Sequence, residues 1–242
     1  MTDTISSDKK IALVTGANRG IGLEIAKELA KNNMIVYLGS RDLANAEQAV
    51  DALKKEHGLT DIHPVKLDVS DEDDMLDVAE LLNDTHGKLD VLVNNSGVFL
   101  EGEFGISSET FHQSFEVNAI APYMLTRYMT PLLQKSSAPR VVNQSSMMGS
   151  MTLMSTNPQP ASPAYCASKA ALNMITIAQA NELAEYGIKV NACHPGWVKT
   201  RMGGDDGQLS IEEGAKSAIR LALLPDDGPS GGFFHGDGVM PW

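Results

Sequence analysis

The sequence predicts an α/β fold in which a doubly wound parallel sheet of about seven strands carries helices on both faces. Apolar runs alternate with helical patterns along the chain, which is the order of elements in such a fold. The runs are apolar throughout, as expected for strands that are buried on both faces of a parallel sheet. The first run ends in a glycine-rich turn that opens a helix, so the chain is expected to begin with a strand–turn–helix unit.

Length and composition indicate a single globular domain. The chain has 242 residues, of which 43% are hydrophobic and 21% charged, and this size is sufficient for one large α/β core. No repeat, low-complexity tract or linker divides the sequence. We therefore expect one domain over residues 1–242.

The first half of the chain is predicted to contain four strands, with a helix after each of the first three. The strands are the apolar runs Ile11–Thr15, Met34–Leu38, Ile62–Leu67 and Leu89–Val93. The helices are marked by Ile21, Ile25 and Leu29 at helical spacing, by the charged segment Leu43–His57, and by an acidic first turn after Asp71. Ser70 precedes that acidic turn and is expected to cap it.

The second half alternates long helices with three further strands. The helices are predicted at Glu109–Leu133, Pro163–Tyr186 and Ile211–Leu224, and the strands at Arg140–Asn143, Ile188–Ala192 and Gly232–Phe234. Pro122 and Pro131 predict a bend within the first of these helices. Two segments rich in Gly, Pro and Ser are predicted to be irregular, Met147–Ala164 and Gly203–Ser210, and long loops at strand ends are often functional.

Charge and cysteine content argue against several classes of partner. The net charge of -12 disfavours binding to nucleic acid, to an anionic membrane or to an acidic carrier protein. No apolar run is long enough to span a bilayer, and the first ten residues contain no apolar signal core, so cytoplasm is the expected compartment. The two cysteines and six histidines show no metal-ligand spacing, so we expect no metal site.

The turn after the first strand is the first candidate binding site. Its glycines, at positions 16, 20 and 22, permit a tight turn and close approach of a ligand to the backbone, and the helix N-terminus that follows attracts phosphate. Between a first strand and a first helix, such a turn is typical of dinucleotide binding. The residues expected at the cofactor are Gly16, Asn18, Arg19, Gly20, Ile21 and Gly22.

The end of the second strand predicts which dinucleotide binds. Enzymes that use NAD usually place an acid there, whereas the 2′-phosphate of NADP requires a cation. Here the strand ends in Ser40 and Arg41, and Arg19 lies in the glycine-rich turn, so two guanidiniums could bind one phosphate. The alternatives are that Arg41 is a solvated helix start and that Asp42 turns back to the ribose hydroxyls.

A tyrosine and a lysine in a predicted helix indicate the chemistry. Of the five tyrosines, only Tyr165 has a lysine four positions on, Lys169. This spacing places the phenol and the ammonium on one helix face, one turn apart. A cation beside a phenol favours the phenolate and lowers its pKa from about 10, so the pair predicts a proton donor and acceptor for carbonyl or alcohol substrates.

Together these motifs resemble the short-chain dehydrogenase/reductase family in its single-domain, Rossmann-type form, from Lys10 to about Thr200. The resemblance implies that Asp68 and Val69 contact the adenine. It implies that Asn94-Asn95-Ser96-Gly97 corresponds to the family's Asn-Asn-Ala-Gly strand end, with Asn94, Ser96 and Gly97 at the cofactor. It also implies a nicotinamide loop whose cofactor-binding residues are Pro195, Gly196, Val198 and Thr200.

The same resemblance implies a catalytic tetrad. Asn118 falls at the family's catalytic asparagine, and Asn143-Gln-Ser-Ser146 matches its Asn-x-Ser-Ser pattern, in which the second serine is catalytic. Ser146 is therefore expected to hydrogen-bond the carbonyl oxygen, and Tyr165 to exchange a proton with it. Lys169 is expected to lower the pKa of Tyr165 and to bond the nicotinamide ribose, while Asn118 holds a water that links Lys169 to solvent.

The spacing between the catalytic serine and tyrosine indicates a branch of the family. Ser146 and Tyr165 are 19 positions apart, which is longer than in many members, and the extra residues form an insertion around 147–164. This insertion resembles that of monomeric animal and plant carbonyl reductases. We expect it to form part of the substrate wall, where its methionines would suit an adaptable apolar pocket, and we expect a lid around 200–215.

The resulting prediction is an NADPH-dependent ketone or aldehyde reductase, reversible as an alcohol dehydrogenase, whose partner is a small molecule rather than a nucleic acid or a membrane. A 3-oxoacyl-thioester reductase would use the same catalytic residues, and a non-catalytic dinucleotide sensor on the same fold is a further alternative. The resemblance leaves the oligomeric state open. The two long helices correspond to the family's usual tetramer surface, whereas the insertion before Tyr165 resembles that of monomeric relatives, so a dimer, a tetramer and a monomer are all alternatives.

Overall fold

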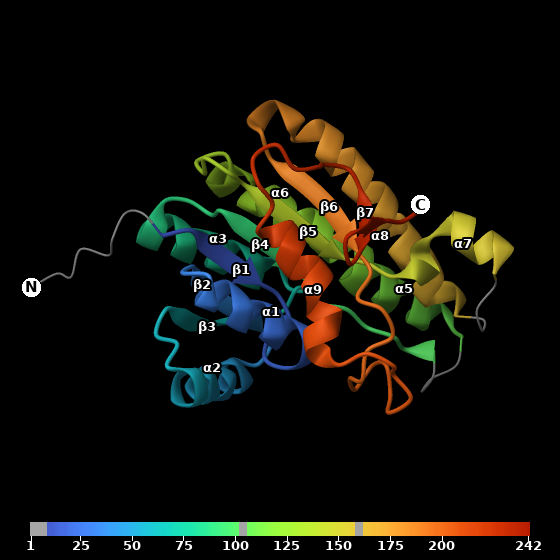
Figure 1. Cartoon of the computed structure of the whole chain (residues 1–242), viewed down its shortest axis with the longest axis horizontal. Helices are drawn as coiled ribbons and strands as arrows, with labels where there is room; N and C mark the ends of the chain where they lie inside the picture. Colours follow the sequence, from blue (N-terminus) through green and yellow to red (C-terminus); the bar gives the residue numbers. More distant parts are fainter. Residues whose placement is uncertain (1–8, 102–105, 158–161) are drawn as a thin grey trace, which may run out of the picture.

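A computed structural model describes residues 9–101, 106–157 and 162–242. Its centre is an eight-stranded sheet in the order β3-β2-β1-β4-β5-β6-β7-β8, which confirms the predicted doubly wound α/β fold (Figure 1). Neighbouring strands from β3 to β7 are parallel, and β7 matches the strand predicted at Gly232–Phe234. The short strand β8, which the sequence did not predict, pairs antiparallel with β7. The strands are β1 (Ile11–Val14), β2 (Ile35–Ser40), β3 (Ile62–Lys66), β4 (Val91–Asn94), β5 (Arg140–Gln144), β6 (Lys189–Cys193), β7 (Phe233–His235) and β8 (Gly238–Val239).

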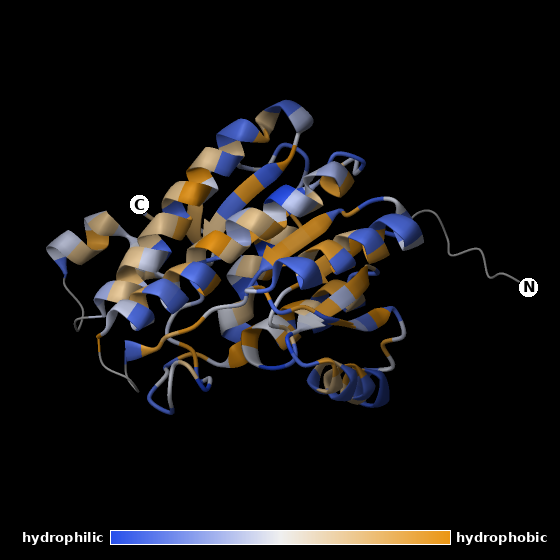
Figure 2. Cartoon of the chain, turned by 180° about the vertical axis from the view of Figure 1, so that it is seen from behind, coloured by the Kyte–Doolittle hydropathy of each residue, from blue (hydrophilic) through white to orange (hydrophobic). Residues whose placement is uncertain are grey.

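Helices cover both faces of this sheet. They are α1 (Gly20–Lys31), α2 (Leu43–His57), α3 (Glu72–His86), α5 (Ser108–Phe115), α6 (Ala121–Leu133), α7 (Met151–Thr156), α8 (Pro163–Glu182) and α9 (Ile211–Ala222). Alternate residues of β1 point to two separate hydrophobic cores: Val14 packs with α1, α2 and α9, and Leu13 packs with α3, α6 and α8. Figure 2 shows the hydrophobic strands at the centre, as expected for a sheet buried on both faces.

The third helix begins one residue later than predicted. Its N-cap is Asp71, whose carboxylate accepts a hydrogen bond from the Asp73 N–H at 3.0 Å. The expected cap, Ser70, instead lies in a turn in which its own N–H donates to the Asp68 carboxylate. The prediction for Ser70 was therefore wrong, because a nearby carboxylate competes for the same capping position.

The predicted helix Glu109–Leu133 is divided by a π-helical turn. This turn, η1 (Glu116–Ile120), separates α5 from α6 and lies just before Pro122, which occupies the first turn of α6. Pro131 lies within α6 and does not end it. A π-turn shifts the backbone hydrogen bonds by one residue, and such turns are frequent at functional sites.

The segment after β5 is more helical than predicted. A short 3-10 turn, η2 (Met147–Gly149), leads into α7, whereas residues 158–161 of the predicted insertion lie outside the described ranges. The C-terminal residues hold α7 in place: the Ser150 hydroxyl donates to the Pro241 carbonyl at 2.7 Å, and the Thr152 N–H donates to the Trp242 carbonyl at 3.0 Å. These contacts come from residues that are distant in the sequence.

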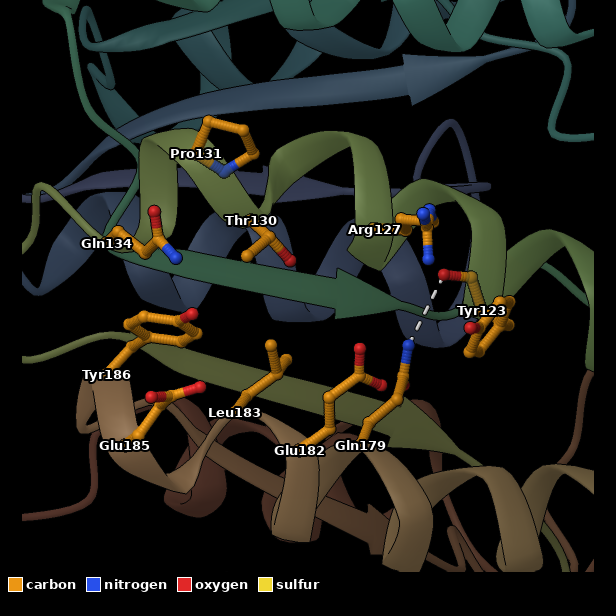
Figure 3. A pocket seen from close by; sticks show the side chains of 10 residues that line it. All are labelled: Tyr123, Arg127, Thr130, Pro131, Gln134, Gln179, Glu182, Leu183, Glu185 and Tyr186. Atoms are coloured by element: carbon orange, nitrogen blue, oxygen red, sulfur yellow. Dashed lines mark hydrogen bonds between the residues drawn. The ribbon is translucent and has the colours of Figure 1, made fainter.

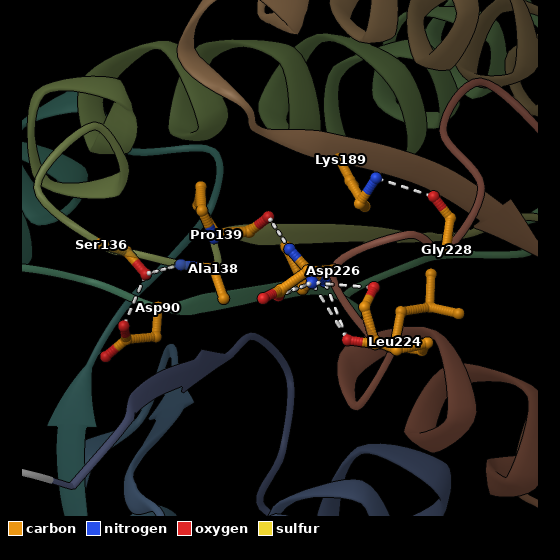
Figure 4. Close-up of polar contacts among 10 residues, drawn as sticks. Asp90, Ser136, Ala138, Pro139, Lys189, Leu224, Asp226 and Gly228 are labelled. Atoms are coloured by element: carbon orange, nitrogen blue, oxygen red, sulfur yellow. Dashed lines mark hydrogen bonds and ion pairs between the residues drawn. The ribbon is translucent and has the colours of Figure 1, made fainter.

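Polar contacts lock the opposite end of the sheet, where β5 and β6 begin (Figure 4). The buried Arg140 guanidinium donates to the carbonyls of Leu224 and Pro225 and contacts the Asp226 carboxylate at 3.1 Å. The Lys189 ammonium donates to the Gly228 carbonyl at 2.7 Å. Within the described ranges, no helix is long and apolar enough to cross a membrane.

Candidate active site

The glycine-rich turn is shaped by the end of β4. The Thr15 hydroxyl accepts the N–H groups of Asn95 and Ser96 at 3.0 and 2.9 Å, and the Asn95 amide donates to the Thr15 and Gly16 carbonyls at 2.9 and 3.2 Å. Gly16 has φ 60°, in the left-handed region. A Cβ on Gly22 would lie 2.4 Å from the Asn95 amide nitrogen, so only glycine fits there. Asn95 thus stabilises the glycine-rich turn. The sequence analysis did not include Asn95 among the residues expected at the cofactor.

Two free guanidiniums lie at the end of this turn and of β2. Arg19 and Arg41 are both exposed, and no hydrogen bond or ion pair of either guanidinium occurs within residues 9–101, 106–157 and 162–242. Asn18 and Ile21 are half-buried beside Arg19. The two arginines are therefore available to an anion.

Asp42 is committed to its own helix. It is the N-cap of α2, and its carboxylate accepts from the Ala44 N–H and the Asn45 amide, both at 2.9 Å. The Ser40 hydroxyl is buried and accepts the Asp42 N–H at 3.3 Å. The hydrogen bonds of the Asp42 carboxylate within α2 oppose the alternative in which this carboxylate turns back to the ribose hydroxyls.

A buried carboxylate holds the backbone at Asp68, next to Val69, where the sequence predicts the adenine contact. Asp74 accepts the Asp68 N–H at 2.9 Å and the Lys66 ammonium at 2.7 Å. Burial alone would raise the pKa of Asp74, but these two hydrogen bonds outweigh burial and lower it. Val69 is buried. Asp74 was missed in the sequence because its position in an acidic helix start is also explained by the helix dipole.

The two asparagines at the ends of β4 and β5 serve the fold. The buried Asn94 amide donates to the Asn143 side chain at 2.8 Å and to the Thr126 hydroxyl at 3.2 Å, which ties both strands to α6. Its side chain is thereby occupied within the protein. Gly97 lies closer to the candidate chemistry, since a Cβ there would be 3.3 Å from the Asn118 side-chain oxygen and 3.6 Å from the Lys169 ammonium.

The structure brings the four predicted catalytic residues together at the carboxyl end of β5. Tyr165 and Lys169 share a face of α8, with the Lys169 nitrogen 5.8 Å from the centre of the Tyr165 ring. The Lys169 ammonium donates to the Gln144 carbonyl at 2.8 Å, which joins α8 to the last residue of β5. Ser146 follows two residues later, and its hydroxyl is near enough to Tyr165 to act on the phenol pKa, which it lowers.

The two neighbouring serines have different environments. The Ser145 hydroxyl donates to the Asn173 side chain at 2.6 Å and is 2% exposed, so it is fixed against α8. The Ser146 hydroxyl accepts the Met148 N–H at 3.2 Å and faces Tyr165. This arrangement supports Ser146 over Ser145 as the residue that contacts a substrate.

Asn118 lies in the π-turn, where its side chain is fully engaged. Its oxygen accepts the Val98 N–H at 2.8 Å, and its amide donates to the Val98 carbonyl at 2.9 Å and to the Ser168 hydroxyl at 3.0 Å. Asn118 thus joins the segment after β4 to α8 at Ser168, about one turn after Tyr165.

Burial sets the pKa values of the tyrosine and the lysine. It raises the pKa of Tyr165 to about 12, although the hydrogen bond with Ser146 opposes the rise. It lowers the pKa of Lys169 to about 8, because a buried ammonium loses its hydration. Desolvation of the phenol sets the direction of the shift in this structure, so a lowering of the Tyr165 pKa by Lys169 stays a prediction.

The predicted nicotinamide loop follows β6 and lies against the glycine-rich turn. Val198 is buried and pairs with Leu209, and the Trp197 indole donates to the Gly203 carbonyl at 2.7 Å. The Thr200 methyl would lie 3.9 Å from a Cβ added to Gly20, which places this loop against the glycine-rich turn. Pro195 and Gly196 begin the loop, and Gly196 has φ 84°. The C-terminal part of the predicted lid, from Ile211 on, belongs to α9.

Two residues near Tyr165 were missed by sequence reasoning. The Phe99 ring lies edge-on to the Tyr165 ring with centroids 5.1 Å apart. The Glu101 carboxylate accepts the N–H groups of Ala164 and Tyr165 at 2.7 and 3.3 Å. Both residues lie more than sixty positions before Tyr165, and no local pattern in the sequence signals these contacts.

A cavity of about 370 Å³ lies elsewhere, between α6 and the C-terminal end of α8 (Figure 3). It is lined by charged and polar side chains, including Arg127, Glu182 and Glu185, and the Gln179 amide crosses it to the Tyr123 carbonyl. None of the four candidate catalytic residues lines this cavity, so it is separate from the candidate active site. Within the described ranges, no group of three or more His, Cys, Asp or Glu residues could hold a metal ion.

Comparisons with known proteins agree with this geometry. A family model described as short chain dehydrogenase matches residues 10–208. A (+)-neomenthol dehydrogenase from Arabidopsis thaliana is 35% identical over 284 aligned positions, which cover 93% of this chain and 95% of the relative. Carbonyl reductase [NADPH] 1 from Pongo abelii is 32% identical, with 98% and 100% covered. The crystal structure of NADPH-bound carbonyl reductase from chicken fatty liver superposes with a TM-score of 0.84 at 30% identity, covering 97% of this chain and 99% of that one.

Proposed function

The chain belongs to the short-chain dehydrogenase family and is an NAD(P)-dependent oxidoreductase of carbonyl and alcohol groups, and we propose that it is an NADPH-dependent reductase of ketones or aldehydes. The observation that carries this proposal is the grouping of Tyr165 and Lys169 on one face of α8 at the carboxyl end of β5, where the Lys169 ammonium binds the Gln144 carbonyl two residues before Ser146. This group lies where the carboxyl end of the sheet meets the glycine-rich turn.

Tyr165 is the proposed proton donor. With a pKa raised to about 12 by burial, its phenol stays protonated at neutral pH and can give its proton to a carbonyl oxygen that gains negative charge. The Ser146 hydroxyl would donate a hydrogen bond to the same oxygen and hold it beside the phenol. Bound NADPH would supply the hydride.

Lys169 and Asn118 are proposed to restore the proton. The lysine pKa of about 8 allows this group to exchange a proton near neutral pH, and a charged ammonium would stabilise the phenolate left after transfer. Asn118 lies in the π-turn and joins it to α8 through Ser168, and a water bound beside this turn would complete the path. The two residues together would connect Tyr165 to solvent.

The preference for NADPH rests on Arg19 and Arg41. Both guanidiniums are exposed and unpaired in the part of the chain that the structure describes, and Asp42 is held as a helix cap. A 2′-phosphate would find two cations and no competing carboxylate. The carbonyl reductase relatives whose names specify NADPH support the same choice.

The proposal is tested by measuring NADPH and NADH oxidation with a panel of carbonyl substrates. The panel should include an aromatic ketone, a monoterpene ketone and a 3-oxoacyl thioester. We expect turnover of the free ketones with NADPH and weak activity with NADH. Turnover of the thioester alone would establish the 3-oxoacyl-thioester alternative. Binding of NADPH without oxidation by any carbonyl compound would instead indicate a dinucleotide sensor.

A further inference from the structure

The helix that carries Tyr165 does not cap itself. Its N-cap residue, Ser162, makes no side-chain hydrogen bond to the first turn of α8. The first turn of a helix leaves backbone N–H groups without helical partners, and in most helices a nearby Ser, Thr, Asp or Asn accepts one of them. The N–H groups that need a partner here belong to Ala164 and to Tyr165 itself.

A distant carboxylate supplies the missing cap. Glu101 accepts the Ala164 N–H with one oxygen at 2.7 Å and the Tyr165 N–H with the other at 3.3 Å. Because a carboxylate at a helix N-terminus also interacts favourably with the helix dipole, this contact is stronger than a neutral cap. Glu101 thereby binds the backbone of Tyr165 directly.

The segment that ends in Glu101 contacts Tyr165 from a second side. Its Val98 backbone is held by the Asn118 side chain, and its Phe99 ring lies against the Tyr165 ring at 5.1 Å. Tyr165 is therefore held by Phe99 at its ring and by Glu101 at its backbone. Both contacts tie the segment after β4 to α8.

We propose that Glu101 is a positioning residue that caps α8 from outside and sets the place of the Tyr165 phenol relative to the substrate carbonyl. The inference rests on the proposed reductase activity. Catalytic geometry tolerates little displacement, so loosening the first turn of α8 should slow proton transfer more than it weakens substrate or cofactor binding.

The reactivity of a neighbouring thiol provides a test of the Glu101 carboxylate that does not depend on enzyme turnover. Cys166 is half-buried, and burial first and the Glu101 carboxylate second raise its pKa. Replacing Glu101 with glutamine keeps an oxygen that can accept a hydrogen bond but removes the charge. The thiolate fraction of Cys166 should then rise, and alkylation of this residue by iodoacetamide should become faster at a fixed pH.

The experiment compares Glu101→Ala, Glu101→Gln and the control Glu109→Ala, which removes an exposed carboxylate on α5. We expect Glu101→Ala to lower kcat roughly tenfold, the effect of losing a charged helix cap, with the NADPH dissociation constant changed less than about twofold. Glu101→Gln should keep most of kcat, and Glu109→Ala should match the unmodified protein. Alkylation of Cys166, located by mass spectrometry, should be faster in Glu101→Gln than in the control.

Two results would overturn the positioning role. One is a kcat for Glu101→Ala within about twofold of the unmodified protein, and the other is a loss that lies wholly in NADPH affinity or thermal stability. If no carbonyl compound is turned over, the proposed reductase activity fails, but the alkylation rates still decide whether the Glu101 carboxylate lies at the start of α8. Equal rates in Glu101→Gln and the unmodified protein would refute that placement.

Discussion

Replacing Arg41 with alanine should lower the preference for NADPH over NADH by roughly tenfold. The two cofactors differ only in the 2′-phosphate, so discrimination depends on groups that can reach it at the end of β2 and in the glycine-rich turn. Arg41 and Arg19 occupy these places with exposed guanidiniums. Asp42, the nearest acid, is held by the Ala44 N–H and the Asn45 amide.

The magnitude follows from the exposure of the arginines. A charge-assisted hydrogen bond contributes roughly 1.5–3 kcal/mol, and the lower end applies here because solvent screens exposed charges. One lost contact of about 1.5 kcal/mol corresponds to about a tenfold change. With both arginines present, the unmodified protein should prefer NADPH on the order of a hundredfold. Added salt should erode this preference because the contact is electrostatic.

The assay is the ratio of kcat/KM for NADPH to that for NADH at low ionic strength, with one ketone throughout. Arg127→Ala serves as the control, because this arginine lines the separate cavity between α6 and α8. A ratio near one in the unmodified protein would refute the phosphate site. So would a ratio that Arg41→Ala leaves within about twofold of its starting value.

Two further predictions concern the residues around Tyr165. Ser146→Ala should lower turnover by about a hundredfold or more, since its contact to the carbonyl oxygen is strongest in the transition state. Ser145→Ala should mainly lower the free energy of unfolding by about 1–3 kcal/mol, through loss of its buried bond to Asn173. Turnover and denaturant titrations of both variants are the measurements, and a larger loss of turnover in Ser145→Ala than in Ser146→Ala would contradict the assignment. For Lys169, whose pKa falls from 10.5 to about 8 on folding, the unfolded chain binds more protons between these values. The contribution of Lys169 to the free energy of unfolding should therefore rise as the pH increases above about 8, and it should be lost as the pH falls through about 8. Tyr165 should oppose this rise only above about pH 10. Lys169→Met should flatten the rise in urea titrations between about pH 7.5 and pH 10, and an unchanged slope would contradict the assignment.

The parts of the fold that depend on local patterns were predictable from the sequence. The strands β1, β2, β4, β5 and β6 coincide with mainly apolar runs, and α2 with a charged amphipathic segment bounded by Asp42 and Gly58. Signals of this kind are periodic and repeated, so a change in any one residue does not hide them. The edge strand β3 departs from the expected pattern, because it exposes His63 and Lys66. The doubly wound order then follows from right-handed connections between parallel strands.

The parts that depend on distant contacts were not predictable. In the Gly-, Pro- and Ser-rich segment after β5, Ser150 caps α7 locally, but Ser150 and Thr152 also bond to the carbonyls of Pro241 and Trp242, which no local pattern signals. The site shows the same limit: the Tyr165–Lys169 spacing is visible in the sequence, but the cap from Glu101 depends on residues 64 positions apart. The rise in the pKa of Tyr165 could not be seen in the sequence, because its burial is a property of the folded chain, not of its neighbours in sequence.

The most direct test of the central claim is the turnover of Tyr165→Phe, which removes the proposed proton donor and keeps the ring that packs against Phe99. NADPH oxidation with the best ketone of the panel should fall by several orders of magnitude, as expected for loss of a general acid. The NADPH dissociation constant, measured by fluorescence on the same preparation, should change by less than about threefold. A Phe variant that keeps more than about a tenth of the turnover would contradict the assignment of Tyr165 as the proton donor.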